Sequence, residues 1–227
     1  MSEFEMEPTP RRGFLARLAA GSLALAASGF ATANAESAHH PSASPEWDET
    51  WMTRIKGKHR QLFDGMTVND GFGLVMTRIW MMTNFQAYKI PEKDLSAVIV
   101  VRHAAICIAM NDSIWSKYKL GEVFNVTDPT TSKPAERNIY ATTAGFWMQP
   151  FAQASVEALK ASGAIMCACN MALMHFAEQA GGKVGIEKDA AIAEWKANLL
   201  PGMTLVPSGV LAVGRAQEHG CVYCNVS

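Results

Sequence analysis

The feature that most constrains this fold is the segment 97–101, Ala-Val-Ile-Val-Val, which is apolar at every position and rich in β-branched residues. Such a run favours a β-strand, because β-branched side chains pack well on a pleated surface. It has no alternation with polar residues, which indicates that both faces of the strand are covered. Central strands of parallel sheets with helices on both faces have this pattern. The segment therefore predicts an α/β domain.

Four further short apolar segments alternate with longer amphipathic ones. The other expected strands are residues 59–64, 164–168, 203–206 and 221–224. The expected helices are residues 71–86, a part of 104–118, and residues 151–161, 172–180, 188–199 and 210–219. Several of these helices end at a glycine, which is a common helix stop. Strands that alternate with helices predict a mainly parallel sheet in a single domain over residues 51–227.

One stretch, residues 121–145, does not fit this alternation. It is polar, contains Asp128-Pro129 and Lys133-Pro134, and has little periodicity. Loops of this length are uncommon in compact domains and are often lids or binding loops. We therefore expect a lid or an oligomerisation arm here.

Residues 1–35 have the organisation of an export signal. Arg11 and Arg12 precede a weakly hydrophobic run over residues 14–31, and Ala33-Asn34-Ala35 suits signal peptidase. The order resembles the twin-arginine (Tat) signal S/T-R-R-x-F-L-K, with Pro and Ala replacing two of its residues. The run is too short and polar for a permanent anchor. We expect residues 1–35 to be a Tat signal peptide, residues 36–50 to be a flexible mature N-terminus, and the protein to be periplasmic.

The charge of the chain is nearly balanced, with 20 basic and 21 acidic side chains and a net charge of −1. This balance indicates no broad basic surface, so we expect no nucleic-acid partner and no stable membrane insertion after cleavage. The odd number of cysteines, five, leaves at least one thiol unpaired within a monomer. An oxidising compartment permits disulfides between the others. Nothing in the sequence indicates a cofactor or a resident metal.

The residues at or just after the ends of the expected strands are candidates for a site, because open parallel sheets bind ligands outside the carboxyl ends of their strands. These residues are Asp64, His103, Cys169 with Asn170, and Ser208 with Gly209. A thiol beside an imidazole and a carboxylate is suited to thiol chemistry, in which the thiolate is the nucleophile. A cysteine at the start of a helix is favoured as an anion. The pattern predicts catalytic roles for Cys169 and His103, and binding roles for the other four.

Each of these residues also has a structural explanation. Cys169 could be a buried apolar side chain, His103 a hydrogen-bonded core residue, Asp64 a turn residue and Ser208 a helix cap. The sequence leaves both sets of roles open.

The pair Cys221 and Cys224 has the spacing of a C-x-x-C redox or metal motif. Residues three apart in a strand point to opposite faces, so the two sulfurs should diverge. We therefore expect no functional pair here.

Several segments of the chain resemble one protein family. They are Arg102-His103 with residues 111–121, the segment 169–173, and the closing segments 206–210 and 216–220. The second is similar to the "V-C-x-N-A-L" segment of DsrE/DsrF-like proteins, and the closing ones to "V-P-S-G-V … Q-x-x-G-Y". The resemblance covers about residues 59–227. It implies a three-layer α/β/α domain with a five-stranded mainly parallel sheet, in homo-oligomers, and a Cys169 thiol that carries sulfur as a persulfide.

Two functions are consistent with these patterns. The first is a thiol-based sulfur carrier or transferase that uses Cys169 and exchanges sulfur with a donor or acceptor protein. The second is a non-catalytic ligand-binding or oligomeric assembly protein of the periplasm. In that case the carboxyl edge of the sheet forms a pocket, and residues 121–145 cover it or join subunits.

Overall fold

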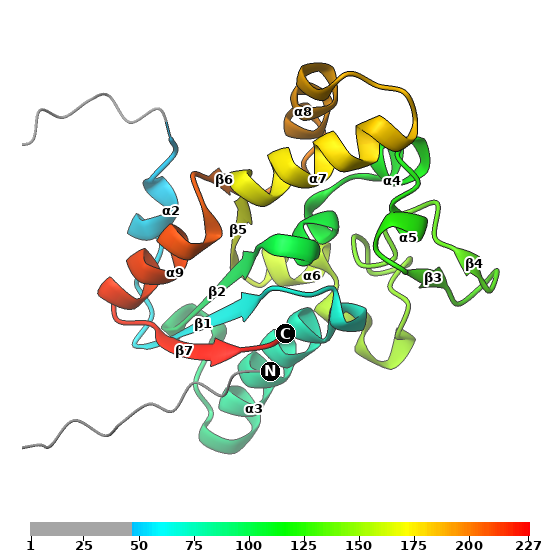
Figure 1. The fold of residues 1–227 in the computed structure, drawn as a ribbon. Coiled ribbons are helices and arrows are strands. Elements are labelled where there is room, and N and C mark those ends of the chain that lie inside the picture. The colour runs from blue at the N-terminus through cyan, green and yellow to red at the C-terminus, as the bar shows by residue number, and fades with distance from the viewer. Residues whose placement is uncertain (1–46) are drawn as a thin grey trace, which may run out of the picture. The chain divides into compact units, whose positions relative to one another are not determined.

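The computed structural model describes residues 47–227, which form an α/β fold on a five-stranded parallel sheet (Figure 1). The strands are β1 (His59–Gly65), β2 (Leu95–Val101), β5 (Ile165–Cys169), β6 (Met203–Val206) and β7 (Val222–Asn225). Their order is β6-β5-β2-β1-β7, and every pairing in this sheet is parallel. A separate antiparallel pair joins β3 (Thr127–Asp128) and β4 (Lys133–Pro134). The predicted α/β class and all five expected strands are confirmed. The expected signal peptide and residues 36–46 lie outside the described residues.

Helices connect and cover the strands. The α-helices are α2 (Thr50–Thr53), α3 (Phe72–Tyr88), α4 (Asp112–Lys117), α5 (Leu120–Val123), α6 (Val156–Ala161), α7 (Asn170–Lys183), α8 (Lys188–Ala197) and α9 (Gly209–Glu218). The 3-10 helices are η1 (Asn69–Gly71), η2 (Glu92–Asp94), η3 (His103–Ala109) and η4 (Gln149–Ala154). The expected helix within 104–118 is in fact η3 followed by α4. The break occurs at Asn111, which is extended and whose Oδ1 accepts a hydrogen bond from the Ile114 N–H.

The sheet has a buried apolar cluster on each face. On one face, Leu62, Val98 and Val100 pack with side chains of α2 and α9. On the other, Phe63, Ile99 and many other residues pack with α3, α6, α7 and α8. Figure 1 shows α2 and α9 on one side of the sheet and α3 on the other. The sheet is therefore the middle layer of a three-layer α/β/α arrangement, and its central strand β2 is buried at every residue, as predicted.

Residues 121–145 are anchored in the structure. Val126, Ile139 and Tyr140 are buried in the cluster on the α3 face. The buried side chain of Asn138 donates hydrogen bonds to the carbonyl oxygens of Ile108 and Met110. These contacts make the segment part of the core packing rather than a free lid. Between residues 47 and 227, no helix combines the length and the apolar character that crossing a membrane requires.

Strands β5 and β6 are adjacent, and the helices that follow them lie on opposite faces of the sheet. Helix α7 follows β5 and packs on the α3 face through Leu173 and Ala177, whereas α9 follows β6 and packs on the opposite face through Ala212 and Ala216. Open parallel sheets bind ligands outside the carboxyl ends of their strands. This geometry places Cys169 and Ser208 at the position where such folds bind ligands.

Candidate functional site

Cys169 is the last residue of β5 and the N-cap of α7, one residue beyond the expected end of the strand and at the start of a helix, as predicted. Its side chain is almost fully buried, and its sulfur accepts a hydrogen bond from the Ala172 N–H at 3.4 Å. The thiol is free of any disulfide. The sulfur therefore lies at the N-terminus of a 14-residue helix, a position that attracts anions in proteins.

Arg102 lies beside Cys169 at the same edge of the sheet. Val101 pairs with Ala168 in the register of β2 and β5, so Arg102 and Cys169 are the next residues on two adjacent strand ends. The pKa of Arg102 is raised above its ordinary value, first by the hydrogen bonds to Asp64 and then by neighbouring acidic groups that include Cys169. A permanent positive charge is therefore close to the thiol.

Asp64 holds Arg102 in place. Its Oδ1 accepts from Arg102 Nε at 2.7 Å, and its Oδ2 accepts from Arg102 Nη2 at 2.8 Å and from the Tyr223 hydroxyl at 2.9 Å. The Asp64 side chain is only 1% exposed and lies within β1, so it is not a turn residue. The hydrogen bond to Asp64 raises the pKa of Tyr223. A bidentate pair of this kind is among the stronger and more directional polar contacts in proteins.

His103 lies at the same edge of the sheet, but its ring packs against α7 instead of hydrogen-bonding to the thiol. It begins η3 with a positive φ of 48°, its side chain is exposed, and its ring packs edge-to-face on Phe176 of α7 at 5.7 Å. No hydrogen bond joins His103 to Cys169 within the described part of the chain. The structure therefore places the imidazole near α7, whereas the register of β2 and β5 places Arg102 beside Cys169.

Asn170, the first residue of α7, is buried beside Cys169. Its Nδ2 donates to the sulfur of Met174 at 3.2 Å. Its Oδ1 is buried and has no hydrogen-bond partner among residues 47–227. Buried polar atoms without a partner are rare, and one at a candidate site is consistent with a ligand that supplies the missing donor.

Ser208 and Gly209 lie where α9 begins. Ser208 caps this helix, with its Oγ accepting from the Leu211 N–H at 3.2 Å. Gly209 packs against Arg102: a Cβ at this position would be 2.5 Å from Arg102 Cβ and 2.8 Å from Cδ. Ser208 is therefore a helix cap, which was one of the two roles that the sequence allowed, and its binding role stays a prediction. Gly209 contributes by allowing the arginine to lie against the start of α9.

The remaining cysteines are separate from this site. Cys221 packs in the cluster under α9, whereas Cys224 faces the α3 side of the sheet, so the expected divergence of the two sulfurs is confirmed. Cys107 and Cys167 are fully buried, and burial raises the pKa of both thiols. Across residues 47–227, no three His, Cys, Asp or Glu side chains cluster in a way that could hold a metal ion.

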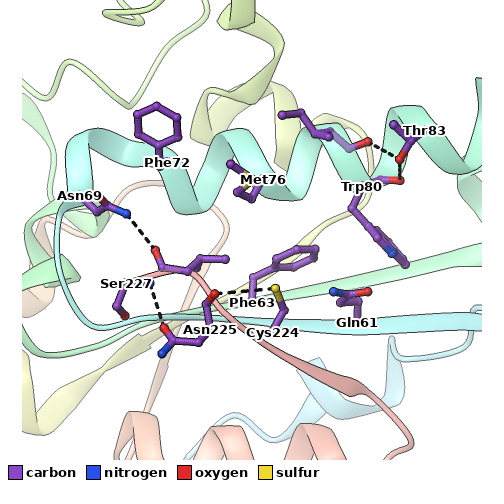
Figure 2. Close-up of a pocket in the computed structure, with 12 residues that line it drawn as sticks. Gln61, Phe63, Asn69, Phe72, Met76, Trp80, Thr83, Cys224, Asn225 and Ser227 are labelled. Atoms are coloured by element: carbon purple, nitrogen blue, oxygen red, sulfur yellow. Dashed lines mark hydrogen bonds between the residues drawn. The ribbon is translucent and has the colours of Figure 1, made fainter.

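An open groove of about 690 Å³ lies between α3 and the edge strand β7. Its lining comprises Gln61, Phe63, Asn69, Phe72, Met76, Ile79, Trp80, Thr83, Cys224, Asn225, Val226 and Ser227. Figure 2 shows Met76 and Trp80 of α3 above Phe63 and Cys224 of the strands. The rings of Phe63 and Trp80 meet edge-to-face at 5.9 Å. This size and apolar character are typical of small-molecule sites.

Two residues of the carboxyl-edge cluster were missed by sequence reasoning. Arg102 directly precedes His103 after a predicted strand, so its position was visible, but nothing in the sequence pairs it with Asp64. Tyr223 reaches Asp64 only because β7 pairs with β1, and a pairing between segments so far apart leaves no local sequence signal.

The chain was compared with protein families, curated proteins and solved structures. No protein-family model, no curated protein and no solved structure matches this chain.

Proposed function

We propose that this chain is an exported DsrE-like protein that carries or transfers sulfur as a persulfide on Cys169. The observation that carries the proposal is the position of the Cys169 sulfur, which accepts a hydrogen bond from the Ala172 N–H at the start of α7 and lies at the carboxyl edge of the sheet. A thiol is nucleophilic as its thiolate, and the N-terminus of a helix is a position that attracts anions. The register that places Arg102 beside it supports the same chemistry.

The proposed loading step is a thiol–disulfide type exchange with a sulfane-sulfur donor such as inorganic polysulfide. The Cys169 thiolate attacks the terminal sulfur of the polysulfide and forms a new S–S bond. The bond between that sulfur and the rest of the polysulfide breaks, and the shortened polysulfide anion leaves with the electron pair. Delivery is the same exchange, with an acceptor thiolate taking the outer sulfur and Cys169 leaving as the thiolate.

Mass spectrometry after incubation with inorganic polysulfide tests this proposal. We expect an adduct of one sulfur atom that dithiothreitol removes and that Cys169→Ser abolishes. Cys167→Ser is the matched control, because this thiol lies two residues earlier in the same strand and is fully buried. An adduct that survives in Cys169→Ser, or the absence of any adduct in the native chain, would contradict the proposal.

Location and assembly belong to the same proposal. We infer Tat-dependent export to the periplasm from residues 1–35. From the DsrE-like resemblance we infer that the protein forms homo-oligomers and has a sulfur donor or acceptor protein as its partner. Replacing Arg11 and Arg12 by lysine should retain the protein in the cytoplasm, as cell fractionation would measure. Light scattering of the purified chain should give a mass of more than one protomer.

A second candidate function, non-catalytic ligand binding, is supported by the groove between α3 and β7. It predicts binding of a small amphipathic molecule, for which the fluorescent probe anilinonaphthalene sulfonate is a stand-in. Met76→Lys, in the groove, should abolish probe binding, whereas Met171→Lys should not, since Met171 is an exposed methionine outside the groove. Equal binding by the two variants would argue against this function.

A further inference from the structure

The side chain of Arg102 is held by contacts with several parts of the fold. Asp64 accepts from two of its nitrogens, Tyr223 orients Asp64 from the opposite side, and Gly209 leaves room for its stem. These contacts come from β1, β7 and α9, so several parts of the fold determine where one guanidinium lies.

Not all donors of this guanidinium are used. Of its five N–H groups, Asp64 takes one from Nε and one from Nη2. Nη1 makes no hydrogen bond within residues 47–227, and the side chain is 20% exposed, so a ligand at the edge can reach it. Asn170 Oδ1, buried and unpartnered, lies on the residue that follows Cys169. A positive donor on the neighbouring strand end and a free acceptor on the following residue thus lie next to Cys169 in the fold.

We propose that Arg102 is the anion-holding residue of the Cys169 site: its guanidinium stabilises the Cys169 thiolate and the outer sulfur of the persulfide formed on it. The persulfide half of this inference rests on the proposed function, whereas the thiolate half does not. Asp64 and Tyr223 act as positioning residues through Arg102. This assigns to an arginine the charge-stabilising role that the sequence suggests for His103.

The charged and titratable groups around Cys169 are few. From β1 comes Asp64, from the end of β2 Arg102, from β7 Tyr223, and from η3 and α7 the exposed His103 and His175. Asp64 is engaged by Arg102 and Tyr223, and His175 makes a hydrogen bond with Gln179. Arg102 is therefore the group best placed to favour an anion at this thiol.

The test measures alkylation of Cys169 by iodoacetamide as a function of pH, with tandem mass spectrometry separating Cys169 from Cys167 on the same peptide. Arg102→Gln should lower the rate about tenfold at neutral pH, since the loss of about 1.4 kcal/mol of charge stabilisation corresponds to a factor of ten. Arg102→Lys keeps the charge and should restore most of the rate. Arg215→Gln is the matched control, because Arg215 forms only an exposed pair with Glu218 on α9.

An unchanged profile in a folded Arg102→Gln variant would overturn the inference. Circular dichroism monitors folding, since Arg102→Gln leaves the Asp64 carboxylate buried without its cation. If that variant does not fold, Asp64→Asn combined with Arg102→Gln leaves a neutral pair that can hydrogen-bond. In this double variant, alkylation of Cys169 should be slower by about threefold or more. A pH profile of alkylation equal to that of the native chain would also overturn the inference.

The two proposals fail in different ways. A native chain that alkylates with the expected dependence on Arg102 but takes up no sulfur contradicts the sulfur-carrier function and leaves the anion-holding role standing. A chain that loads sulfur on Cys169, and whose loading and alkylation are both indifferent to Arg102→Gln, contradicts the role of Arg102 alone.

Discussion

Two glycines of helix α9, Gly209 and Gly214, should respond to alanine in opposite directions. A Cβ on Gly214 would meet nothing within 4 Å, so Gly214→Ala only removes the entropic penalty of a glycine inside a helix. We expect stabilisation of about 0.8–1.0 kcal/mol. A Cβ on Gly209 would lie 2.5 Å from Arg102 Cβ and 2.8 Å from Cδ, far inside van der Waals contact. The obstructing Cβ is near the backbone, so rotating the end of the arginine cannot relieve the clash.

The cost of Gly209→Ala has two parts. Overpacking of this kind costs about 1–3 kcal/mol. Displacing the stem of Arg102 also stretches its hydrogen bonds to the buried Asp64, which are charge-assisted contacts worth about 1.5–3 kcal/mol each. We expect Gly209→Ala to be destabilised by about 2–4 kcal/mol, once partial relaxation is allowed for. Urea unfolding followed by tryptophan fluorescence measures both variants. If Gly209→Ala and Gly214→Ala changed the free energy of unfolding in the same direction and by the same amount, the packing of Arg102 against the start of α9 would be refuted.

Three further predictions concern other charged and thiol groups. Asp64→Asn should destabilise the chain by about 3 kcal/mol in urea unfolding, because it leaves Arg102 without its anion, and a loss below about 1 kcal/mol would contradict the buried pair. Cys107 and Cys167 should resist alkylation at pH 8 in the native chain and react in urea, since burial raises the pKa of both thiols; labelling of either before unfolding would show the core to be packed differently. Hydrogen bonds from Lys117 and then Tyr118 lower the pKa of Glu194 below its ordinary value of 4.5. The unfolded chain therefore takes up this proton first as the pH falls, so stability declines below about pH 4.5. Glu194→Gln should flatten that part of a urea-midpoint profile, and an unaltered profile would count against the contact.

The sheet could be predicted from the sequence because local patterns determine it. The segment 97–101 is apolar throughout and becomes the fully buried strand β2, and the short apolar segments on either side of it become its neighbours. The starts of two helices depend on local chemistry as well, because Cys169 and Ser208, which come directly before α7 and α9, are the N-caps of these helices. These features depend on side chains that are close together in the chain.

The parts that sequence reasoning missed depend on contacts between distant segments. Asp64-Gly65 has the composition of a turn, yet β1 continues through both residues because Asp64 is satisfied by Arg102 and Tyr223. The polar segment 121–145 has the composition of a lid. In the structure, however, the buried Asn138 side chain donates hydrogen bonds to the carbonyl oxygens of Ile108 and Met110, which attach the segment to the core. In both cases polar residues are buried because a partner from elsewhere in the fold pairs with them.

The position of Cys169 at the carboxyl edge was predicted, whereas its electrostatic neighbour was not. The pattern pointed to His103, the residue after Arg102, as the group that would favour a thiolate. In the structure the histidine turns onto Phe176 with a left-handed backbone, and the register of β2 and β5 leaves the arginine beside the thiol. A shift of one residue at a strand end thus changes which side chain faces the site, and only tertiary structure decides it.

Cyanolysis of the polysulfide-treated chain tests the central claim most directly. Cyanide removes the outer sulfur of a persulfide as thiocyanate and leaves the thiol, so the thiocyanate released counts the sulfur that the protein carries. We predict close to one thiocyanate per chain for the native protein and for Cys167→Ser, and none for Cys169→Ser. Thiocyanate release that persists in Cys169→Ser, or that is absent from the native protein, would contradict a sulfur carrier built on Cys169.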